Sequence, residues 1–455
     1  MKMKFKRRLK KLFSKKVSIN LSKNALIRLL SFILVLSVPV AVIRVFLASK
    51  HLSNSSVQEM AGIYGTVTDR FGQTLYDGDN KNEKIFGSVI YGGKMMENVI
   101  TAKYKDLLTP GKVGYLLGHR TLEEKPRVLK TTLLSEESQK QLVNLFGNKS
   151  GCCFSYNYKT GEVYTAISLP GYSSSSDSSY INRCFSSVYI PGSTMKFVTS
   201  VLAIEQNMDM TKLSYTCTGS LTLPDGTKIN CPGAHGKQKF VDGLGNSCNC
   251  FFASIIMKLD LDKAIESMKK MGFSVNEDKA QAGKIDRLSK ETSRLNITNT
   301  ASFKNVWSLI GQGSSQVNAV DMAVIAGAVA NDGKAATPYI VSSVTNVNKK
   351  DKIIYEAKTQ SKEYMSENGA EKMQLFWGNA VKQNYHPNGY STLIDYAKTG
   401  TAETNSKGSV NKTLVGVIEE ADTAFYIVVE DWHSGEVLPA AVANTLASLL
   451  PKNSD

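Results

Sequence analysis

The most distinctive pattern along the chain is one uninterrupted apolar run near its beginning. It covers Leu29–Ile43 and is flanked by Arg28 and Arg44. Extended to Ala25–Ala48, with the arginine stems lying along the helix, it provides about 24 residues, enough for one tilted helix across roughly 30 Å of hydrocarbon. The excess of basic residues before it predicts that residues 1–24 stay in the cytoplasm and that everything after the helix lies outside.

Two other interpretations of this run are less consistent with the sequence. A cleaved signal peptide ends in a small-x-small site. A cut after Ala48 would have the bulky Phe46 at the first of these small positions, so no such site is present there. A buried helix of a soluble protein would not be so uniformly apolar behind so basic a segment. We therefore expect an uncleaved, single-pass membrane anchor.

After the anchor, the spacing of apolar and polar positions predicts a mixture of strands and helices. A hairpin is expected about Asp69–Gly72, and two strands about the turn Lys159–Gly161. A helix capped by serine is expected over Ser135–Phe146. Two further strands are expected about Glu419–Asp422, followed by a helix over Pro439–Leu450 with proline in its first turn. Strands at both ends of a long segment predict an α/β domain with a central antiparallel sheet flanked by helices.

The length of 455 residues is sufficient for such a domain and smaller parts before it. We expect a basic cytoplasmic tail over residues 1–24, the anchor over 25–48, a small membrane-proximal region over 49–126 and the α/β domain over 127–455. With 42% apolar and 21% charged residues, the chain is not a disordered or low-complexity protein.

The net charge of +15 is concentrated at the N-terminus. Residues 1–50 contain 13 Lys and Arg and no acidic residue, so the other 405 residues carry only +2. The basic charge therefore belongs to the anchor and its tail, and it gives no indication of a nucleic-acid partner.

The histidines and cysteines indicate no metal site from their positions along the chain. The five histidines are scattered, so we expect no metal cofactor and no zinc chemistry; they are His51, His119, His235, His386 and His433. Seven cysteines are present. Cys217 and Cys231 bracket a turn-rich stretch that a disulfide could close, whereas the adjacent Cys152 and Cys153 are typical of small buried side chains. The sequence leaves the pairing open.

The first candidate for catalysis is the pair Ser193 and Lys196, at the start of a predicted helix. Side chains three residues apart lie on one face of the first turn, within reach of each other. A serine hydroxyl is a weak nucleophile, and an amine with a lowered pKa can take its proton. The N-terminus of the helix adds backbone N–H donors near the reacting centre. By itself, however, an S-x-x-K pair is common on solvated helices.

Two further motifs follow in order. Ser247-Cys248-Asn249 precedes an apolar helical run, and Lys398-Thr399-Gly400-Thr401 follows a strand-like segment. Each has a structural explanation of its own, because S-x-N often caps a helix and K-T-G often forms a turn. S-x-x-K, S-x-N and K-T-G in this order are the signature of serine enzymes that recognise penicillin. The combination therefore indicates acyl transfer through a serine.

At these residues the chain resembles the transpeptidase domain of penicillin-binding proteins. The stretches that carry the resemblance are Asn182–Ser200, Asn246–Ala253, Gly311–Pro338 and Lys398–Glu403. Asp69–Leu75 resembles the membrane-proximal region of the class B, monofunctional members. The likeness covers most of residues 60–450 and leaves no stretch for the glycosyltransferase domain of bifunctional members. It implies the α/β fold shared by these proteins and serine β-lactamases.

The resemblance implies a role for each motif residue. Ser193 attacks the carbonyl between the two terminal D-alanines of a peptidoglycan stem peptide, and Lys196 is the general base. Ser247, helped by Lys398, relays a proton to the departing D-alanine, and Asn249 positions the substrate amide. An amine on a neighbouring stem then resolves the acyl-enzyme and forms a crosslink.

The third motif is expected to bind the substrate. Lys398, Thr399 and Thr401 suit its terminal carboxylate, and Gly400 lets the strand backbone approach closely. The N–H groups of Ser193 and Thr401 would form the oxyanion hole. β-Lactams should acylate Ser193. The resemblance implies no cofactor. The expected partners are the lipid bilayer and a membrane glycosyltransferase.

Some features depart from the family pattern or leave other functions open. Ala397 stands where glycine is more usual, and the run after the third motif lacks the usual aromatic pair. A serine β-lactamase would need a base for its deacylating water, such as the glutamate of an E-x-x-L-N segment. In Glu291–Asn296 the spacing from Glu to Asn is one residue longer than in that form, and we expect the end of an amphipathic helix there. A β-lactam sensor and a catalytically idle scaffold of wall synthesis are the remaining alternatives.

Overall fold

The computed structural model describes most of the chain beyond the N-terminal tail. The described residues are 22–54, 65–77, 104, 127–170, 182–277, 283–300, 302–346, 352–404, 409–436 and 438–452. The chain divides into two compact units: Met1–Gly62 with Pro110–Glu124, and Ile63–Thr109 with Lys125–Asp455.

The first unit contains one long helix, α2 (Lys23–Asn54), which includes Pro39. Among the described residues it is the one helix that is long and apolar enough to cross a membrane, and its window Lys23–Val40 is not buried in the protein. Leu34 and Val35, for example, are 67% exposed. An apolar helix near an N-terminus is typical both of a membrane anchor and of a signal sequence.

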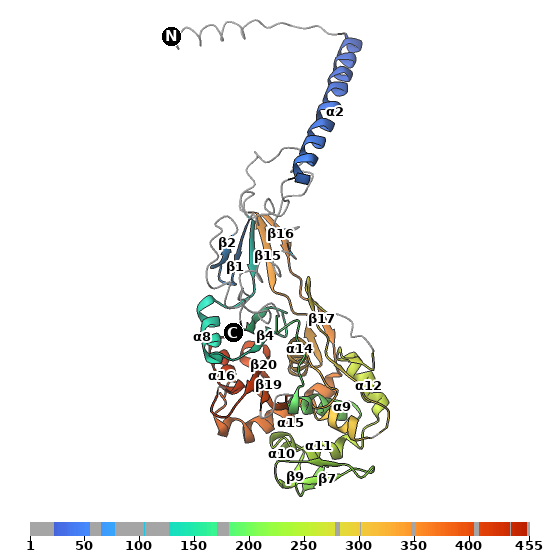
Figure 1. The fold of residues 1–455 in the computed structure, drawn as a ribbon, viewed down its shortest axis with the longest axis vertical. Coiled ribbons are helices and arrows are strands. Elements are labelled where there is room, and N and C mark those ends of the chain that lie inside the picture. Colours follow the sequence, from blue (N-terminus) through green and yellow to red (C-terminus); the bar gives the residue numbers. More distant parts are fainter. Residues whose placement is uncertain are drawn as a thin grey trace. The chain divides into compact units, whose positions relative to one another are not determined.

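The second unit is built around a five-stranded antiparallel sheet in the order β18-β19-β20-β4-β5, and Figure 1 labels β4, β19 and β20 of this sheet. Its strands are β4 (Gly151–Asn157), β5 (Val163–Leu169), β18 (Tyr396–Glu403), β19 (Val410–Ile418) and β20 (Thr423–Trp432). Every residue of β4 and β5 is buried, which explains why these segments are apolar at nearly consecutive positions. The C-terminal strands therefore complete the sheet that β4 begins, as the sequence predicts.

Helices pack against this sheet. α8 (Glu136–Phe146) and α16 (Pro439–Leu449) contact each other, and α16 also contacts β19 and β20. α14 (Ala319–Ala330) lies against β20, β19 and β4, and it contacts α15 (Glu367–Asn384). α15 in turn contacts α9 (Met195–Glu205) and β18. In this way α15 connects the helix that follows Ser193 with the strand that carries the third motif.

A second five-stranded sheet has the order β16-β15-β3-β1-β2. Its strands are β1 (Gly65–Thr68), β2 (Thr74–Asp77), β3 (Arg127–Thr131), β15 (Val341–Asn346) and β16 (Lys352–Glu356). β1 pairs with β3 in parallel, and β3 pairs with β15 antiparallel. One sheet thus takes strands from both sides of residue 126, and the division of the chain into four parts stays a prediction.

Several locally predicted elements are confirmed. β1 and β2 form the hairpin about Asp69–Gly72, and the side chain of Ser135 caps α8 by accepting a hydrogen bond from the backbone N–H of Ser138. β4 and β5 are antiparallel neighbours, as are β19 and β20. The prediction for Glu291–Asn296 is wrong. Arg294 and Leu295 form a short strand, β13, paired in parallel with β10 (Ser274–Val275), because strand pairing overrides the helical spacing there.

The remaining elements are short. They are η4 (Gly192–Thr194), β6 (Ser214–Cys217), β7 (Ser220–Thr222), β8 (Lys228–Asn230), β9 (Gly236–Lys239), α10 (Phe240–Gly245), α11 (Asn249–Ile256), α12 (Leu261–Lys270), β10 (Ser274–Val275), β11 (Gly283–Ile285), β12 (Leu288–Lys290), β13 (Arg294–Leu295), α13 (Phe303–Leu309), β14 (Lys334–Ala336), β17 (Ser361–Glu363), η5 (His386–Asn388) and η6 (Glu419–Ala421). Two of these pairs, β6 with β9 and β7 with β8, form separate two-stranded ribbons before α10 and α11.

Candidate active site

Ser193 and Lys196 face each other at the beginning of α9. Ser193 lies in the single turn η4, and α9 starts two residues later. Lys196 Nζ is 2.9 Å from Ser193 Oγ. The lysine is fully buried, so its stem is held by the packing of α9 and its amine reaches back by one turn. The predicted contact between the two side chains is therefore present.

The surroundings of Lys196 disfavour its charged form. Its Nζ is 2.6 Å from both the Ser247 carbonyl oxygen and Asn249 Oδ1, and 3.4 Å from Ser247 Oγ. Burial lowers the pKa of Lys196 well below its ordinary value, and the positive charge of Lys398 lowers it further. The amine beside Ser193 thus loses its proton far more readily than an exposed lysine does.

The second motif is held in a tight turn between α10 and α11. Ser247 has a φ of 55°, in the left-handed region that costs a non-glycine residue free energy. Cys248 is the N-cap of α11, and its Sγ accepts a hydrogen bond from the backbone N–H of Phe251 at 3.3 Å. Asn249 Nδ2 donates to the carbonyl of Asn230 at 2.8 Å. This bond fixes the amide so that its oxygen faces Lys196.

Lys398 reaches the same turn from the central sheet. It lies on β18, and its Nζ donates to Ser247 Oγ at 2.9 Å and to the carbonyl of Thr399 at 2.9 Å. The side chain is fully buried, and this burial lowers the pKa of Lys398 to about 7. The structure therefore brings together all five predicted catalytic side chains, which come from α9, the α10–α11 turn and β18.

The backbone of η4 touches the backbone of β18. A Cβ on Gly192 would lie 2.5 Å from the Thr401 carbonyl oxygen and 2.8 Å from the Thr401 nitrogen. A Cβ on Gly400 would lie 2.4 Å from the Pro191 carbonyl oxygen and 2.2 Å from Thr413 Oγ1. Both approaches exclude any larger residue. They place the main chain around Ser193 directly beside the main chain of Thr401.

The sequence analysis missed two polar residues that contact the third motif. Lys412 Nζ donates to Thr401 Oγ1 at 3.0 Å and lies 4.5 Å from the centre of the Trp432 ring; burial lowers its pKa. Tyr385 Oη accepts a hydrogen bond from the Thr399 N–H at 3.1 Å. A prediction that pairs β18 with the next strand could have found Lys412, because Thr401 and Lys412 are register partners. Tyr385 gives no such signal.

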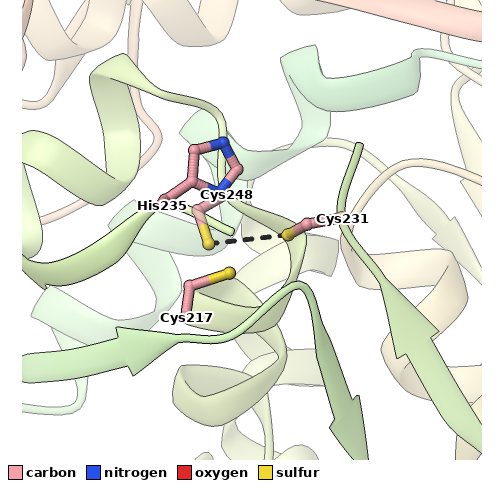
Figure 2. A group of neighbouring side chains, drawn as sticks. All are labelled: Cys217, Cys231, His235 and Cys248. Atoms are coloured by element: carbon pink, nitrogen blue, oxygen red, sulfur yellow. Dashed lines mark hydrogen bonds between the residues drawn. The ribbon is translucent and has the colours of Figure 1, made fainter. Parts of the chain in front are cut away.

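One group of potential ligands also differs from the sequence-based expectation. Histidine spacing predicted no metal cluster, but the ligand atoms of Cys217, Cys231, His235 and Cys248 all lie within 4.8 Å of one another. Figure 2 shows the three sulfur atoms and the imidazole gathered together. Spacing along the chain could not reveal this group, because strand pairing brings distant residues together.

A family model identifies the chain that carries this site. The model of the penicillin-binding protein transpeptidase domain matches residues 151–448. The chain belongs to the penicillin-binding protein transpeptidase family. The resemblance carried by the three motifs is therefore confirmed, and so is the predicted fold class.

Relatives of this transpeptidase-family chain agree with the assignment. Stage V sporulation protein D of Bacillus subtilis is 25% identical over 408 residues, which cover 84% of this chain and 60% of that protein. The chain thus spans about three fifths of the relative's length.

Solved structures show the same fold. Penicillin-binding protein A of M. tuberculosis, as a ceftriaxone acyl-enzyme, superposes with a TM-score of 0.72 at 18% identity, covering 87% of this chain and all of that one. The D,D-transpeptidase domain of a peptidoglycan glycosyltransferase from Eggerthella lenta gives 0.67 at 20% identity, with 85% and 98% covered.

Proposed function

We propose that this protein is a membrane-anchored D,D-transpeptidase that crosslinks peptidoglycan stem peptides through an acyl-enzyme on Ser193, and that β-lactams acylate the same hydroxyl. The observation that carries the proposal is the contact between Ser193 Oγ and a buried, solvent-excluded amine, Lys196 Nζ, at 2.9 Å. Membership of the transpeptidase family supports it.

The contacts of Lys196 suit a general base. A neutral amine has two N–H donors and one lone pair. The Ser247 carbonyl and Asn249 Oδ1, each 2.6 Å away, can only accept hydrogen bonds at those atoms, so they take the two donors. The lone pair is then left for the Ser193 hydroxyl. Lys196 takes this proton as Oγ attacks the carbonyl carbon between the two terminal D-alanines.

The groups around Ser193 suit the charges that develop in this step. The negative oxygen of the tetrahedral intermediate would be held by the backbone N–H groups of Ser193 and Thr401, and the close approach of Gly192 to Thr401 supports this pairing. The terminal carboxylate of the substrate would bind to Thr399, Thr401 and Lys398. Gly400 keeps β18 close enough to η4 for both sets of contacts.

Departure of D-alanine needs a proton on its nitrogen. The Ser247 hydroxyl lies within 3.4 Å of Lys196 Nζ and 2.9 Å of Lys398 Nζ, so it can pass on the proton that Lys196 has taken. The C–N bond breaks and the peptide remains as an ester on Ser193. An amine of a neighbouring stem then attacks the ester, Lys196 takes its proton, and Ser193 Oγ leaves with that proton restored. The crosslinking amide is the product.

The location follows from the apolar helix. In our proposal α2 is an uncleaved single-pass anchor, with the basic residues before it in the cytoplasm and the catalytic domain on the outer side of the cell membrane, where the stem peptides are. A membrane glycosyltransferase that makes the glycan strands would be the partner, because the described domain provides only acyl transfer.

Labelling with fluorescent penicillin tests the function. Membranes containing the full chain should give a stable covalent band, and Ser193→Ala should abolish it. Ser254→Ala, on the helix after the second motif, is the matched control and should label normally. A band that fades within minutes would indicate a β-lactamase, and no band at all would indicate an idle scaffold; either result would overturn the proposal.

A further inference from the structure

Four side chains close to the second motif have the composition and spacing of a metal site. They are Cys217, Cys231, His235 and Cys248, whose ligand atoms lie within 4.8 Å of one another. Two thiolates on one tetrahedral Zn²⁺ lie about 3.8 Å apart, because a Zn–S bond is about 2.3 Å long. The sulfurs of Cys231 and Cys248 are 3.6 Å apart. This pair therefore has the required separation, and no two of the four ligand atoms are more than 4.8 Å apart, which exceeds that separation by about 1 Å. Figure 2 shows the four side chains gathered around one point.

The fold brings these residues together from three elements. Cys217 ends β6 and is the register partner of Gly236 on β9, which places it beside His235. Cys231 follows β8, and its backbone N–H donates to the Gly219 carbonyl at 2.8 Å. Cys248 is the N-cap of α11. Two ribbons and one helix thus meet at a single point.

One buried nitrogen of the group has only the cysteine thiols as polar neighbours. His235 Nδ1 is buried and makes no hydrogen bond of regular geometry, and the His235 side chain interacts with the thiols of Cys217 and Cys248. A buried polar atom in that state costs free energy unless something binds it. An imidazole nitrogen that faces three cysteine sulfurs is suited to a metal ion, which would remove this cost. Neither the proposed transpeptidase chemistry nor the packing of the fold accounts for it.

We propose that Cys217, Cys231, His235 and Cys248 bind one structural Zn²⁺. Three thiolates and one imidazole complete a tetrahedral shell, so no position is left for water or substrate and the role is not catalytic. This soft donor set selects Zn²⁺ over magnesium, calcium or manganese. Binding releases the protons of the three thiols. The N–H groups of Cys250 and Phe251, each 3.3 Å from a ligand sulfur, stabilise the thiolates of Cys231 and Cys248.

The zinc site supports the second motif directly. Cys248 lies between Ser247 and Asn249, and Cys231 follows Asn230, whose carbonyl holds the Asn249 amide. A Zn²⁺ ion that bridges Cys231 and Cys248 would therefore lie beside the hydrogen bond between Asn230 and Asn249. Two-stranded ribbons have little stability of their own in water. The metal fixes them to the turn in which Ser247 adopts its left-handed conformation.

Metal analysis of the full chain tests the site without relying on activity. Protein purified from membranes in detergent, without chelator and under reducing conditions, should contain one zinc per chain by mass spectrometry of the metal. Cys231→Ser and His235→Ala should each lower the content at least about fivefold. Cys184→Ser is the matched control and should keep its zinc, because Cys184 is a buried cysteine outside the group and its thiol donates to the Ile167 carbonyl.

A second readout uses the metal as a probe. Replacement of zinc by Co²⁺ should give the visible ligand-field bands of a tetrahedral site and thiolate charge-transfer bands, and the charge-transfer intensity should fall in Cys231→Ser. Wild-type protein with well below one zinc per chain would overturn the inference, as would a Cys231–Cys248 disulfide in a chain whose free thiols are alkylated at cell lysis, before any reductant is added. If the chain bound zinc but was not acylated by penicillin, the zinc inference would stand and the proposed function would be refuted.

Discussion

Lys196 and Lys398 both reach the hydroxyl of Ser247, with their Nζ atoms 3.4 Å and 2.9 Å from Oγ. Both lysines are fully buried, although they come from α9 and β18. Two ammonium groups so close together in a desolvated site repel each other. The site therefore favours one neutral and one charged amine near neutral pH, the combination that a base and an acid need.

The first prediction concerns the pH dependence of acylation by a penicillin. The rate should rise as Lys196 loses its proton, well below the pH at which a free lysine titrates, because burial and Lys398 lower its pKa. It should fall again as Lys398, with a pKa of about 7, loses the charge that binds the carboxylate. In Lys398→Arg the falling limb should disappear, because guanidinium stays charged. Stopped-flow acylation across the neutral range measures this, and a rate that rises only in strongly alkaline buffer would be inconsistent with it.

The second prediction is that Lys398→Met stabilises the fold while abolishing acylation. Burial lowers the pKa of Lys398 from 10.5 to about 7 in the folded chain. Between these pH values the unfolded chain binds the proton and the folded chain does not, so wild-type stability rises with pH across this window. Removing the lysine should therefore raise the free energy of unfolding by roughly 1–4 kcal/mol at pH 7, and the gain should shrink toward pH 10.

Urea denaturation of the detergent-solubilised chain measures this difference. Lys372→Met, at an exposed position on α15, is the control and should change the free energy by less than about 0.5 kcal/mol. A Lys398→Met variant that is less stable than wild type at pH 7 would refute the linkage.

The third prediction concerns Lys412, which donates to Thr401 Oγ1. This bond leaves the Thr401 hydroxyl proton free for the substrate carboxylate and adds a positive charge beside it. Lys412→Met should lower the acylation rate at low penicillin concentration about 5- to 30-fold, which corresponds to about 1–2 kcal/mol. Thr401→Val should have a similar effect, and the double variant should be little worse than either. Strictly additive losses would show that the two residues act separately.

The fourth prediction concerns the aromatic stack between α9, α15 and β18. Trp377 lies 4.4 Å from the ring of Phe197 and 5.4 Å from that of Tyr396, and its indole N–H donates to the Ala397 carbonyl at 2.7 Å. Trp377→Ala should lower the free energy of unfolding by about 3–5 kcal/mol. Trp377→Phe keeps the stacking but loses the hydrogen bond, so it should cost less, roughly 1–3 kcal/mol.

Urea denaturation of these variants checks the prediction against Leu375→Ala. Leu375 is on the same helix and 62% exposed, so its loss should cost less than about 0.5 kcal/mol. If Trp377→Ala were as stable as Leu375→Ala, the stack would not hold β18 against α9.

The sequence alone was sufficient for the three motifs and the central sheet. Ser193 and Lys196 are one helical turn apart, so their contact follows from helix geometry. The strands about Lys159–Gly161 and Glu419–Asp422 have apolar runs and turn residues that act over short distances. These features depend on neighbours along the chain and can be inferred without knowing the fold.

Features that depend on pairing between distant segments could not be inferred in this way. Lys412 meets Thr401 only because β18 and β19 are in one register. The four ligands of the proposed zinc site meet only because β6 pairs with β9 and because α11 contacts β6 and β8. The short strand at Arg294 was misread as helical, since its partner β10 is some twenty residues earlier in the sequence.

The central claim is that Ser193 is the nucleophile, primed by Lys196. Peptide mapping by mass spectrometry, after brief exposure of the full chain to penicillin, tests it most directly. We predict one penicilloyl adduct, on the tryptic peptide that contains Ser193, and a large loss of that adduct in Lys196→Ala. An adduct on another serine, such as Ser247, or undiminished modification in Lys196→Ala would contradict the account.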